Sequence, residues 1–581
     1  MASRQVLHVT IGDWVVALLL ALVPLVFLRD ALEPFQTVKA TVLVVGAATL
    51  VCALVASRTT MQVAIRREPA FAALLATFLL VAVAATAFSS WPRIAIHGDH
   101  AHSAGLVMYV ALAVVAIAAI SGADGAVAVR LWLRALTVSV GTAAAYALLQ
   151  AAGGDPFVWV DIGLTGTAST LGQQNFASGF LGAAAPAVAG LAPLRRERPG
   201  WRVAGGMAAV LAVAALPTTR SFQGVVALVA GTLLLGLTLG VDLGQRLDRG
   251  RRRQAIVGLA VVIAALGVVA VTLRARLAGL VEQGLEERRY FWTAAADLIR
   301  EHPVLGTGPD TFGLYFPTIR PAEHASRFLG VNAEAPHNVP LAMFSNGGTL
   351  LGVAYLAFCA YVAYRLVRGL VQVDGERRLL LGSVGALWLG YQVQSLVSID
   401  VPSLALLHFV ASGAIIALSR PPQAVPGRKR AARAPAVGAP VLVALALAVV
   451  VVWTSSGPLR ADIHAGRGLA AAQAGDADQA QRRMDRAVEI APYRGIYWYL
   501  QANLAAARMD LPTALRAATA AAERDPGNAT SAMLAGNLAY QLGDDAAAAD
   551  WFREAATRDP HNAEIADEVD NRLRDLEGPP S

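Results

Sequence analysis

The sequence has little charge and almost no cysteine. Only 15% of its 581 residues are Asp, Glu, Lys or Arg, whereas soluble domains carry roughly a quarter. Hydrophobic residues make up 56%, and the mean hydropathy is +0.52. Both cysteines, Cys52 and Cys359, lie inside apolar runs, which argues against a disulfide framework or a thiolate zinc site. The composition excludes an ordinary soluble protein and predicts one large polytopic membrane domain with a smaller unit attached.

Apolar runs long enough to cross a bilayer, about 20 residues each, recur through most of the chain. They predict an all-α bundle of about 12–13 transmembrane helices. The first run has no clear small-residue cleavage site after it, so we expect a retained helix rather than a signal peptide. The runs lie near 13–28, 38–56, 69–88, 104–120, 130–152, 176–194, 203–217, 222–241, 255–273, 339–364, 379–398, 403–419 and 437–453.

Arginine is concentrated in every second gap between these runs. The net charge is +7 (48 − 41), but it is not gathered into the single basic face that a nucleic-acid-binding protein would show. Under the positive-inside rule, the basic gaps and the N-terminus face the cytoplasm. The segments 153–175, 217–221, 274–338 and 398–402, and the tail after the last run, are then predicted to face outward. The basic gaps hold Arg58, Arg66 and Arg67, Arg130 and Arg134, Arg195–Arg202, Arg246–Arg253, Arg365–Arg378 and Arg420–Arg433.

The tail repeats with a period of 34 residues. Pro492, Pro526 and Pro560 have this spacing, and two columns of alanine and one of aspartate share it. The period is that of tetratricopeptide repeats, in which alanines let paired helices approach and proline ends the second helix. We expect repeats at 461–494, 495–528 and 529–562 and a short capping helix to about 575. Such repeats present a concave surface to a protein or a glycan, or they act as a platform for the outer loop.

The predicted organisation therefore has three parts. A polytopic membrane domain spans 1–436 and carries a large outward loop at about 274–338. A last transmembrane helix follows at 437–457. The repeat domain occupies 458–581.

Two outward segments carry polar residues at the ends of predicted membrane helices. Polar side chains are costly near a bilayer, so these residues are candidates for a functional role. Gln173, Gln174 and Asn175 open the sixth run, and their amides could bind sugar hydroxyls or phosphate oxygens, or simply cap the helix. Arg220 lies in a very short turn with Thr218, Thr219 and Ser221. Its guanidinium suits a phosphate, although an arginine that snorkels to the membrane surface would look the same.

The long outward loop carries two further motifs. Arg288 and Trp292 are four residues apart, which places them on one face of an expected amphipathic helix, and Arg289 is the alternative arginine. A turn from His302 to Gly308 follows as a structural stop. His337 and Asn338 precede the tenth run, and a histidine there is suited to act as a base near neutral pH, or is structural.

A separate group of His97, Asp99, His100 and His102 hints at a metal. Its spacing fits neither a helical nor a zinc-finger pattern. We therefore expect a solvated loop here and no metal site.

Taken in order, these motifs resemble the O-antigen ligase superfamily, which includes O-antigen polymerases and protein O-oligosaccharyltransferases. The resemblance covers about 13–420, its motif-bearing part is 165–355, and some members carry C-terminal tetratricopeptide repeats. The chain departs from the family at three places. The usual Ser–Arg–Gly turn is Arg220-Ser221-Phe222, the Gly–Asn–x–Asn motif has Gln173 as its first amide, and Asn346 replaces an acidic residue.

The resemblance implies a membrane-embedded glycosyltransferase of the bacterial inner membrane, with its active face and repeats in the periplasm. It would transfer a glycan from an undecaprenyl-diphosphate carrier to lipid A core, another glycan or a protein, with inversion and with no metal or other cofactor. His337 would be the base or acceptor-positioning residue, and Arg288 and Arg220 would bind the diphosphate. Asn175, Gln174, Arg289, Trp292 and Asn338 are the candidate substrate-binding residues.

The residues themselves do not distinguish between the activities of a ligase, a polymerase and a protein glycosyltransferase. They also leave open a protein partner for the repeats. A transporter of lipid-linked glycans is the main alternative of another class, but it would be expected to show internal symmetry and polar midplane helices. A scaffold acting only through its repeats would need one anchor helix rather than about thirteen.

Overall fold

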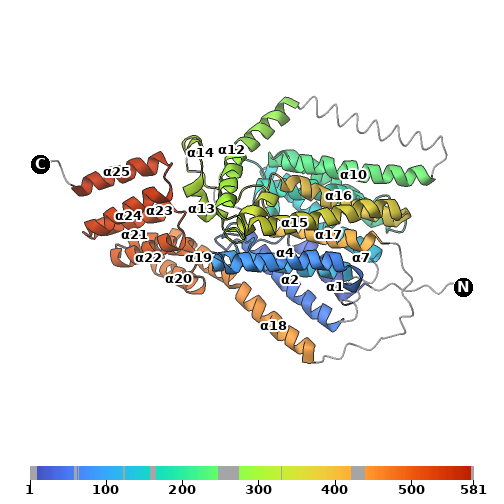
Figure 1. Cartoon of the computed structure of the whole chain (residues 1–581), viewed down its shortest axis with the longest axis horizontal. Helices are drawn as coiled ribbons and strands as arrows, with labels where there is room; N and C mark the ends of the chain where they lie inside the picture. Colours follow the sequence, from blue (N-terminus) through green and yellow to red (C-terminus); the bar gives the residue numbers. More distant parts are fainter. Residues whose placement is uncertain are drawn as a thin grey trace.

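The described part of the chain is mostly helical. The computed structural model describes residues 9–57, 62, 65–121, 125–157, 165–246, 274–328, 330–420 and 439–577, and these ranges contain no strand. Seven of the described helices are long and apolar enough to cross a membrane. The bundle lies at one end of an elongated molecule and the repeat helices at the other (Figure 1). The predicted all-α membrane bundle with a helical tail is confirmed.

Twelve of the thirteen predicted runs coincide with a described helix, and the run at 255–273 lies outside the described residues. The first helix ends at Leu22 rather than at 28, because Pro24 lacks the backbone N–H that would continue the helical hydrogen bonds. Arg130 and Arg134 lie inside a helix rather than in a gap. The bundle helices are α1 (Ile11–Leu22), α2 (Gln36–Ala56), α4 (Pro69–Ala87), α6 (Leu106–Ser121), α7 (Gly125–Ala151), α8 (Gln174–Ala189), α9 (Pro199–Ala215), α10 (Gln223–Arg246), α15 (Val339–Gln372), α16 (Gly375–Ser395), α17 (Pro402–Leu418) and α18 (Ala439–Ser455).

Small residues bring the central helices of the bundle together. A Cβ placed on Gly182 of α8 would lie 2.0 Å from the carbonyl oxygen of Gly224 on α10. A Cβ on Gly190, which directly follows α8, would lie 1.9 Å from Ser383 Oγ on α16. Close approach through glycine is the usual way in which helices pack inside a membrane, where lipid tails compete with apolar side chains for contact.

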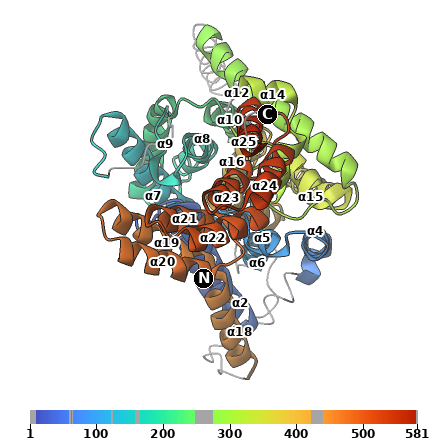
Figure 2. The same ribbon diagram turned by 90° about the vertical axis from the view of Figure 1, so that its left-hand side faces the viewer.

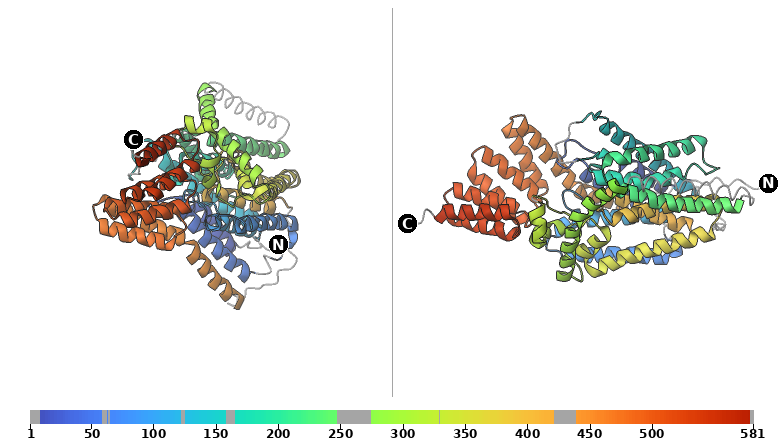
Figure 3. Two further views of the ribbon diagram at one scale, coloured as in Figure 1. Left: turned by 60° about the vertical axis from the view of Figure 1, so that its left-hand side comes forward. Right: turned by 90° about the horizontal axis from the view of Figure 1, so that it is seen from above.

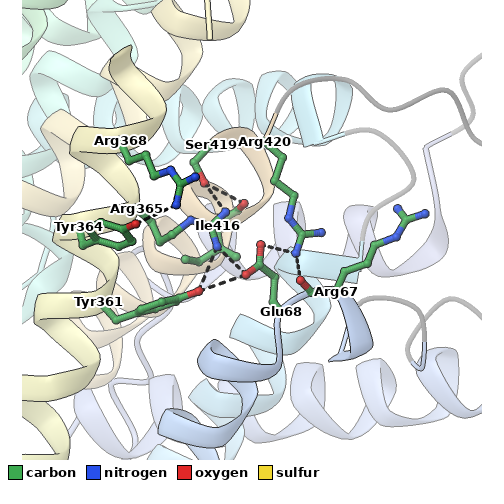
Figure 4. A network of polar contacts seen from close by, with 9 residues as sticks. All are labelled: Arg67, Glu68, Tyr361, Tyr364, Arg365, Arg368, Ile416, Ser419 and Arg420. Carbon is green, nitrogen blue, oxygen red and sulfur yellow. Dashed lines mark hydrogen bonds and ion pairs between the residues drawn. The ribbon is translucent and has the colours of Figure 1, made fainter. Parts of the chain in front are cut away.

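An ionic network joins three helices at the end of the bundle away from the repeats (Figure 4). Glu68, 5% exposed, precedes α4 and pairs with Arg365 of α15 at 2.5 Å and with Arg420 after α17. The hydroxyl of Tyr361 donates to the same carboxylate at 3.2 Å, and Arg365 also donates to Ser419 Oγ at 2.8 Å. The negative charge of Glu68 is thus neutralised by two arginines from different parts of the chain.

Two more pairs lie between segments of the predicted basic gaps. Arg130 pairs with Glu376 at 2.6 Å, and Arg134 pairs with Glu197, also at 2.6 Å. Together with the network at Glu68, these contacts link residues from basic gaps that are far apart in sequence. We call this the basic end of the bundle and the opposite one the repeat end.

The tail consists of three helix pairs and a capping helix, as the 34-residue period predicts. The six repeated alanines are fully buried between the helices of each pair. The repeated aspartates Asp476, Asp510 and Asp544 cap the second helix of each pair by accepting a backbone N–H three residues on. The helices are α19 (Gly457–Gln473), α20 (Ala477–Ile490), α21 (Gly495–Ala507), α22 (Leu511–Arg524), α23 (Ala529–Gln541), α24 (Asp545–Arg558) and α25 (Ala563–Glu577).

The repeats are docked across the repeat end of the bundle (Figure 2). In the first repeat, Asp462 accepts from His100 at 2.8 Å and from the Tyr497 hydroxyl at 2.7 Å. At the end of the third repeat, Asp559 pairs with Arg320 through two hydrogen bonds of 3.0 and 2.7 Å. Figure 3 shows two short helices that follow α12 (Arg274–Glu301) lying between the bundle and the repeats, α13 (Phe312–Ile319) and α14 (Ala322–Arg327). These contacts favour the platform role weighed for the repeats.

Candidate functional site

The first two outward motifs lie against each other at the repeat end. The N–H of Thr167 donates to the carbonyl of Thr218 at 3.0 Å, and their hydroxyls are 2.7 Å apart. Gln174 holds the same loop, because its Oε1 accepts from the N–H of Gly166 at 2.7 Å. Gly172 has φ +84, and a Cβ there would lie 2.4 Å from the Phe35 ring, so this position requires glycine.

Helix α12 (Arg274–Glu301) brings the third motif to this pair of loops. The Arg288 guanidinium lies 5.6 Å from the centre of the Phe222 ring, two residues after Arg220. Arg288 is 7% exposed, whereas Arg289 is exposed to solvent. Burial lowers the pKa of Arg288, and the neighbouring Glu287 opposes that shift. The contrast in burial favours Arg288 over Arg289 as the arginine that faces the site.

His337 lies beside the same helix. Its ring centre is 5.4 Å from that of Phe291, which lies three residues after Arg288. Its backbone has φ +52, a left-handed conformation that residues other than glycine seldom adopt and that clusters at functional sites. Burial, reinforced by the charges of Arg288 and His102, lowers the pKa of His337 to about 3. The imidazole is therefore neutral at pH 7 and can accept a hydrogen bond.

The turn from Pro303 to Gly308 docks onto a break in α15, the helix that follows His337. Gly348 interrupts that helix with φ +65, and a Cβ there would lie 2.2 Å from the carbonyl of Val304. The N–H of Gly308 donates to the carbonyl of Asn346 at 2.7 Å, and that of Thr349 donates to Pro303 at 2.8 Å. The predicted stop is thus docked onto the short helical segment 339–347, which begins two residues after His337. In the sequence, the uninterrupted apolar run at 339–364 predicts one continuous helix and does not indicate this break.

Three of the predicted amide ligands have structural hydrogen bonds. Gln173 caps α8 by accepting from the N–H of Asn175 and that of Phe176. Asn338 caps α15 by accepting from the N–H of Leu341 at 2.9 Å, and Gln174 holds Gly166. The side chain of Asn175 is half-buried in the first turn of α8. Capping, the alternative reading of these amides, accounts for Gln173 and Asn338.

Polar groups at Arg220, its neighbour Ser221 and Trp292 are available to contact a ligand. Arg220 is exposed and ends the turn 216–219 with φ +50. Its neighbour Ser221 is 7% exposed, and its hydroxyl has no hydrogen bond within the described chain. The Nε1 of Trp292 is likewise buried without an acceptor in the described ranges. Buried hydrogen-bond donors are normally paired, so the Ser221 hydroxyl and the Trp292 Nε1 are candidates to contact a substrate.

The expectation of a solvated loop at 97–102 is wrong. His102 is 7% exposed, and its Nε2 lies 3.3 Å from Glu334 Oε2 and its Nδ1 3.9 Å from Asp310 Oδ1. Burial lowers the pKa of His102, but the contacts with Asp310 and Glu334 outweigh it and raise the pKa to about 9. The sequence pattern missed this cluster because Glu334 and Asp310 come from loops more than 200 positions away.

The assembled site can bind an anion and orient a hydroxyl group. Arg288 is a fixed positive charge in a partly dry setting, where it stabilises negative charge more strongly than in water. His337 supplies a neutral acceptor close to it. The four outward motifs, separated by about 160 positions, meet at the repeat end.

Comparison with known families agrees with the resemblance. Residues 178–356 match the family model described as O-antigen ligase, a region that contains Arg220, Arg288 and His337. No curated protein matches the chain. A solved structure, the TPR2AB-domain:pHSP90-complex of yeast Sti1, is 14% identical over 44% of this chain and 91% of its own, with a TM-score of 0.20, too low to bear on the fold. The chain is thus a multi-pass membrane protein in which residues 178–356 match the O-antigen ligase family model.

Proposed function

We propose that the protein is a glycosyltransferase that moves a glycan from an undecaprenyl-diphosphate carrier to an acceptor hydroxyl. The observation that carries this proposal is the placement of buried Arg288 beside the neutral His337, within the region that matches the O-antigen ligase family. The repeat end of the bundle would be the periplasmic face of a bacterial inner membrane. The basic end would be cytoplasmic, in line with the positive-inside rule.

In the proposed reaction, the acceptor oxygen attacks the anomeric carbon while the bond from that carbon to the diphosphate oxygen breaks. The attack comes from the opposite face, so the configuration inverts. Arg288 stabilises the charge that develops on the leaving diphosphate, with Arg220 as the second phosphate ligand. No metal is needed in this scheme, because diphosphate leaves readily when fixed positive charge is present.

His337 would take the proton of the acceptor hydroxyl. A histidine with a pKa of about 3 is a weak base. The bound diphosphate would offset the charge of Arg288 and raise the pKa of His337. Binding of the donor would therefore make His337 a stronger base, so that the acceptor hydroxyl is activated only when the donor is present.

Lipid A core is the proposed acceptor, as in an O-antigen ligase. A growing polysaccharide chain or a serine or threonine of a protein are the alternatives within the same superfamily. A transporter of lipid-linked glycans remains the alternative of another class.

The test uses purified protein, an undecaprenyl-diphosphate-linked glycan, and lipid A core, a second glycan and an acceptor protein offered separately. Carrier release and acceptor mass are followed for the native protein, His337→Asn and Arg288→Ala. Asn tolerates the left-handed backbone at 337, so His337→Asn removes the imidazole with little strain. We expect both variants to lose at least about 100-fold in rate, whereas the exposed Arg289→Ala keeps its activity.

Full activity of both variants would refute the site. Carrier binding without transfer to any acceptor, together with movement of intact carrier across vesicles, would instead favour the transporter.

A further inference from the structure

Three carboxylates surround one imidazole at the repeat end. Asp99, His102 and Glu334 each present a ligand atom, and these atoms lie within 4.8 Å of one another. Asp310 forms one wall, since its Oδ2 accepts from the N–H of Asp99 at 2.7 Å and from that of Ala104 at 2.9 Å. The three carboxylates outnumber the one imidazole, and a further cation, the guanidinium of Arg494, interacts with Asp99.

Such a concentration of negative charge is costly where water is limited. His102 is 7% exposed, and its Nδ1 has no hydrogen bond within the described residues. Each of the two loops that meet here has one residue in the left-handed region, Ser103 with φ +54 and Asp310 with φ +59. A buried ring nitrogen without a hydrogen bond, set among three carboxylates, points to a further positive partner at this cluster.

We propose that Asp99, His102 and Glu334 bind a divalent cation such as Zn²⁺ or Mn²⁺, which ties the loop at 98–104 to the loop that carries His337. Imidazole with two carboxylates is a donor set that suits these ions, whereas Mg²⁺ and Ca²⁺ prefer oxygen alone. Ligands at about 2.1 Å on opposite sides of an ion are about 4.2 Å apart, so a shift of about half an ångström would close the site. The half-exposed Glu334 leaves a route from solvent.

This inference goes beyond the proposed transfer and does not depend on it. No step of that reaction uses the ion, and both loops that it joins are fixed by other contacts as well. His100, two residues from His102, is held by Asp462 of the first repeat at 2.8 Å. The cation would thus complete a chain of contacts from the repeats through the first outer loop to the loop that carries His337.

The experiment titrates chelator-stripped full-length protein in detergent with Zn²⁺ alone, and separately with Mn²⁺ alone. Bound metal is counted after equilibrium dialysis, and thermal unfolding is measured with and without the ion. We expect one ion per chain and a raised unfolding temperature. His102→Ala, Asp99→Asn and Glu334→Gln should each weaken binding at least tenfold, whereas His302→Ala, which removes an exposed histidine, should leave it unchanged.

Two outcomes would overturn the proposal. The first is a native protein that takes up no ion above the level of its variants, in which case a proton on His102 alone holds the carboxylates together. The second is equal binding by Glu334→Gln, a substitution that keeps side-chain size at a half-exposed position and should not prevent folding. Because bound metal is measured directly, neither result depends on whether glycan transfer occurs.

Discussion

The buried pair of Arg320 and Asp559 should hold the repeats to the outer loop. Its side chains are 4% and 11% exposed, and two parallel hydrogen bonds of 3.0 and 2.7 Å join them. Asp559→Asn keeps the shape but removes the charge, which leaves Arg320 as a buried cation without its partner. Breaking a buried pair in this way costs about 3–5 kcal/mol. We expect the lower end, because the carbonyl of Val331 still accepts from Arg320 at 3.2 Å.

Hydrogen exchange measured by mass spectrometry would report this loss at residues 312–327. A loss of about 3 kcal/mol in the free energy of local opening corresponds to exchange that is about 100-fold faster, at about 1.4 kcal/mol per tenfold change. The matched control is Asp550→Asn, the same chemical change on α24 in an exposed pair with Arg553 at 3.1 Å. Exposed pairs contribute about 0–1 kcal/mol, so this variant should exchange like the native protein. Equal exchange in Asp559→Asn and Asp550→Asn would refute the argument.

The other predictions concern the broken helix, the repeat caps and pH. Gly348→Ala should lower the unfolding temperature and the transfer rate, since its methyl group would lie 2.2 Å from the Val304 carbonyl at a backbone φ of +65; unchanged values would contradict the docking of the turn onto α15. Asp544→Ala should cost about 1 kcal/mol by removing a helix cap, and chemical unfolding of the repeats should show no such loss for the adjacent Asp545→Ala. Burial, with the charge of Asp99, raises the pKa of Asp525 to about 6 from 3.8. The contribution of the protonated carboxyl to stability is complete below about pH 4 and is lost as pH rises through 6. Asp525→Asn should therefore stabilise the repeats by up to about 3 kcal/mol at pH 7.5, and not at pH 4. Equal effects on the free energy of unfolding at both pH values would exclude this cause.

The sequence determined most of the architecture. Helix-length apolar runs follow directly from the thickness of a bilayer, and a 34-residue period follows from the geometry of a helix pair. Both are local or periodic properties that composition and spacing carry without any knowledge of packing. The order of the outward motifs also identified the family region.

The tertiary structure decided how those motifs are used. It separated Arg288 from Arg289 by burial, assigned Gln173 and Asn338 to helix caps, and revealed the break at Gly348. It also placed His102 beside Glu334, where the spacing along the chain had suggested a solvated loop. Burial and pairing depend on side chains that arrive from distant loops, and no local pattern encodes which loops will meet.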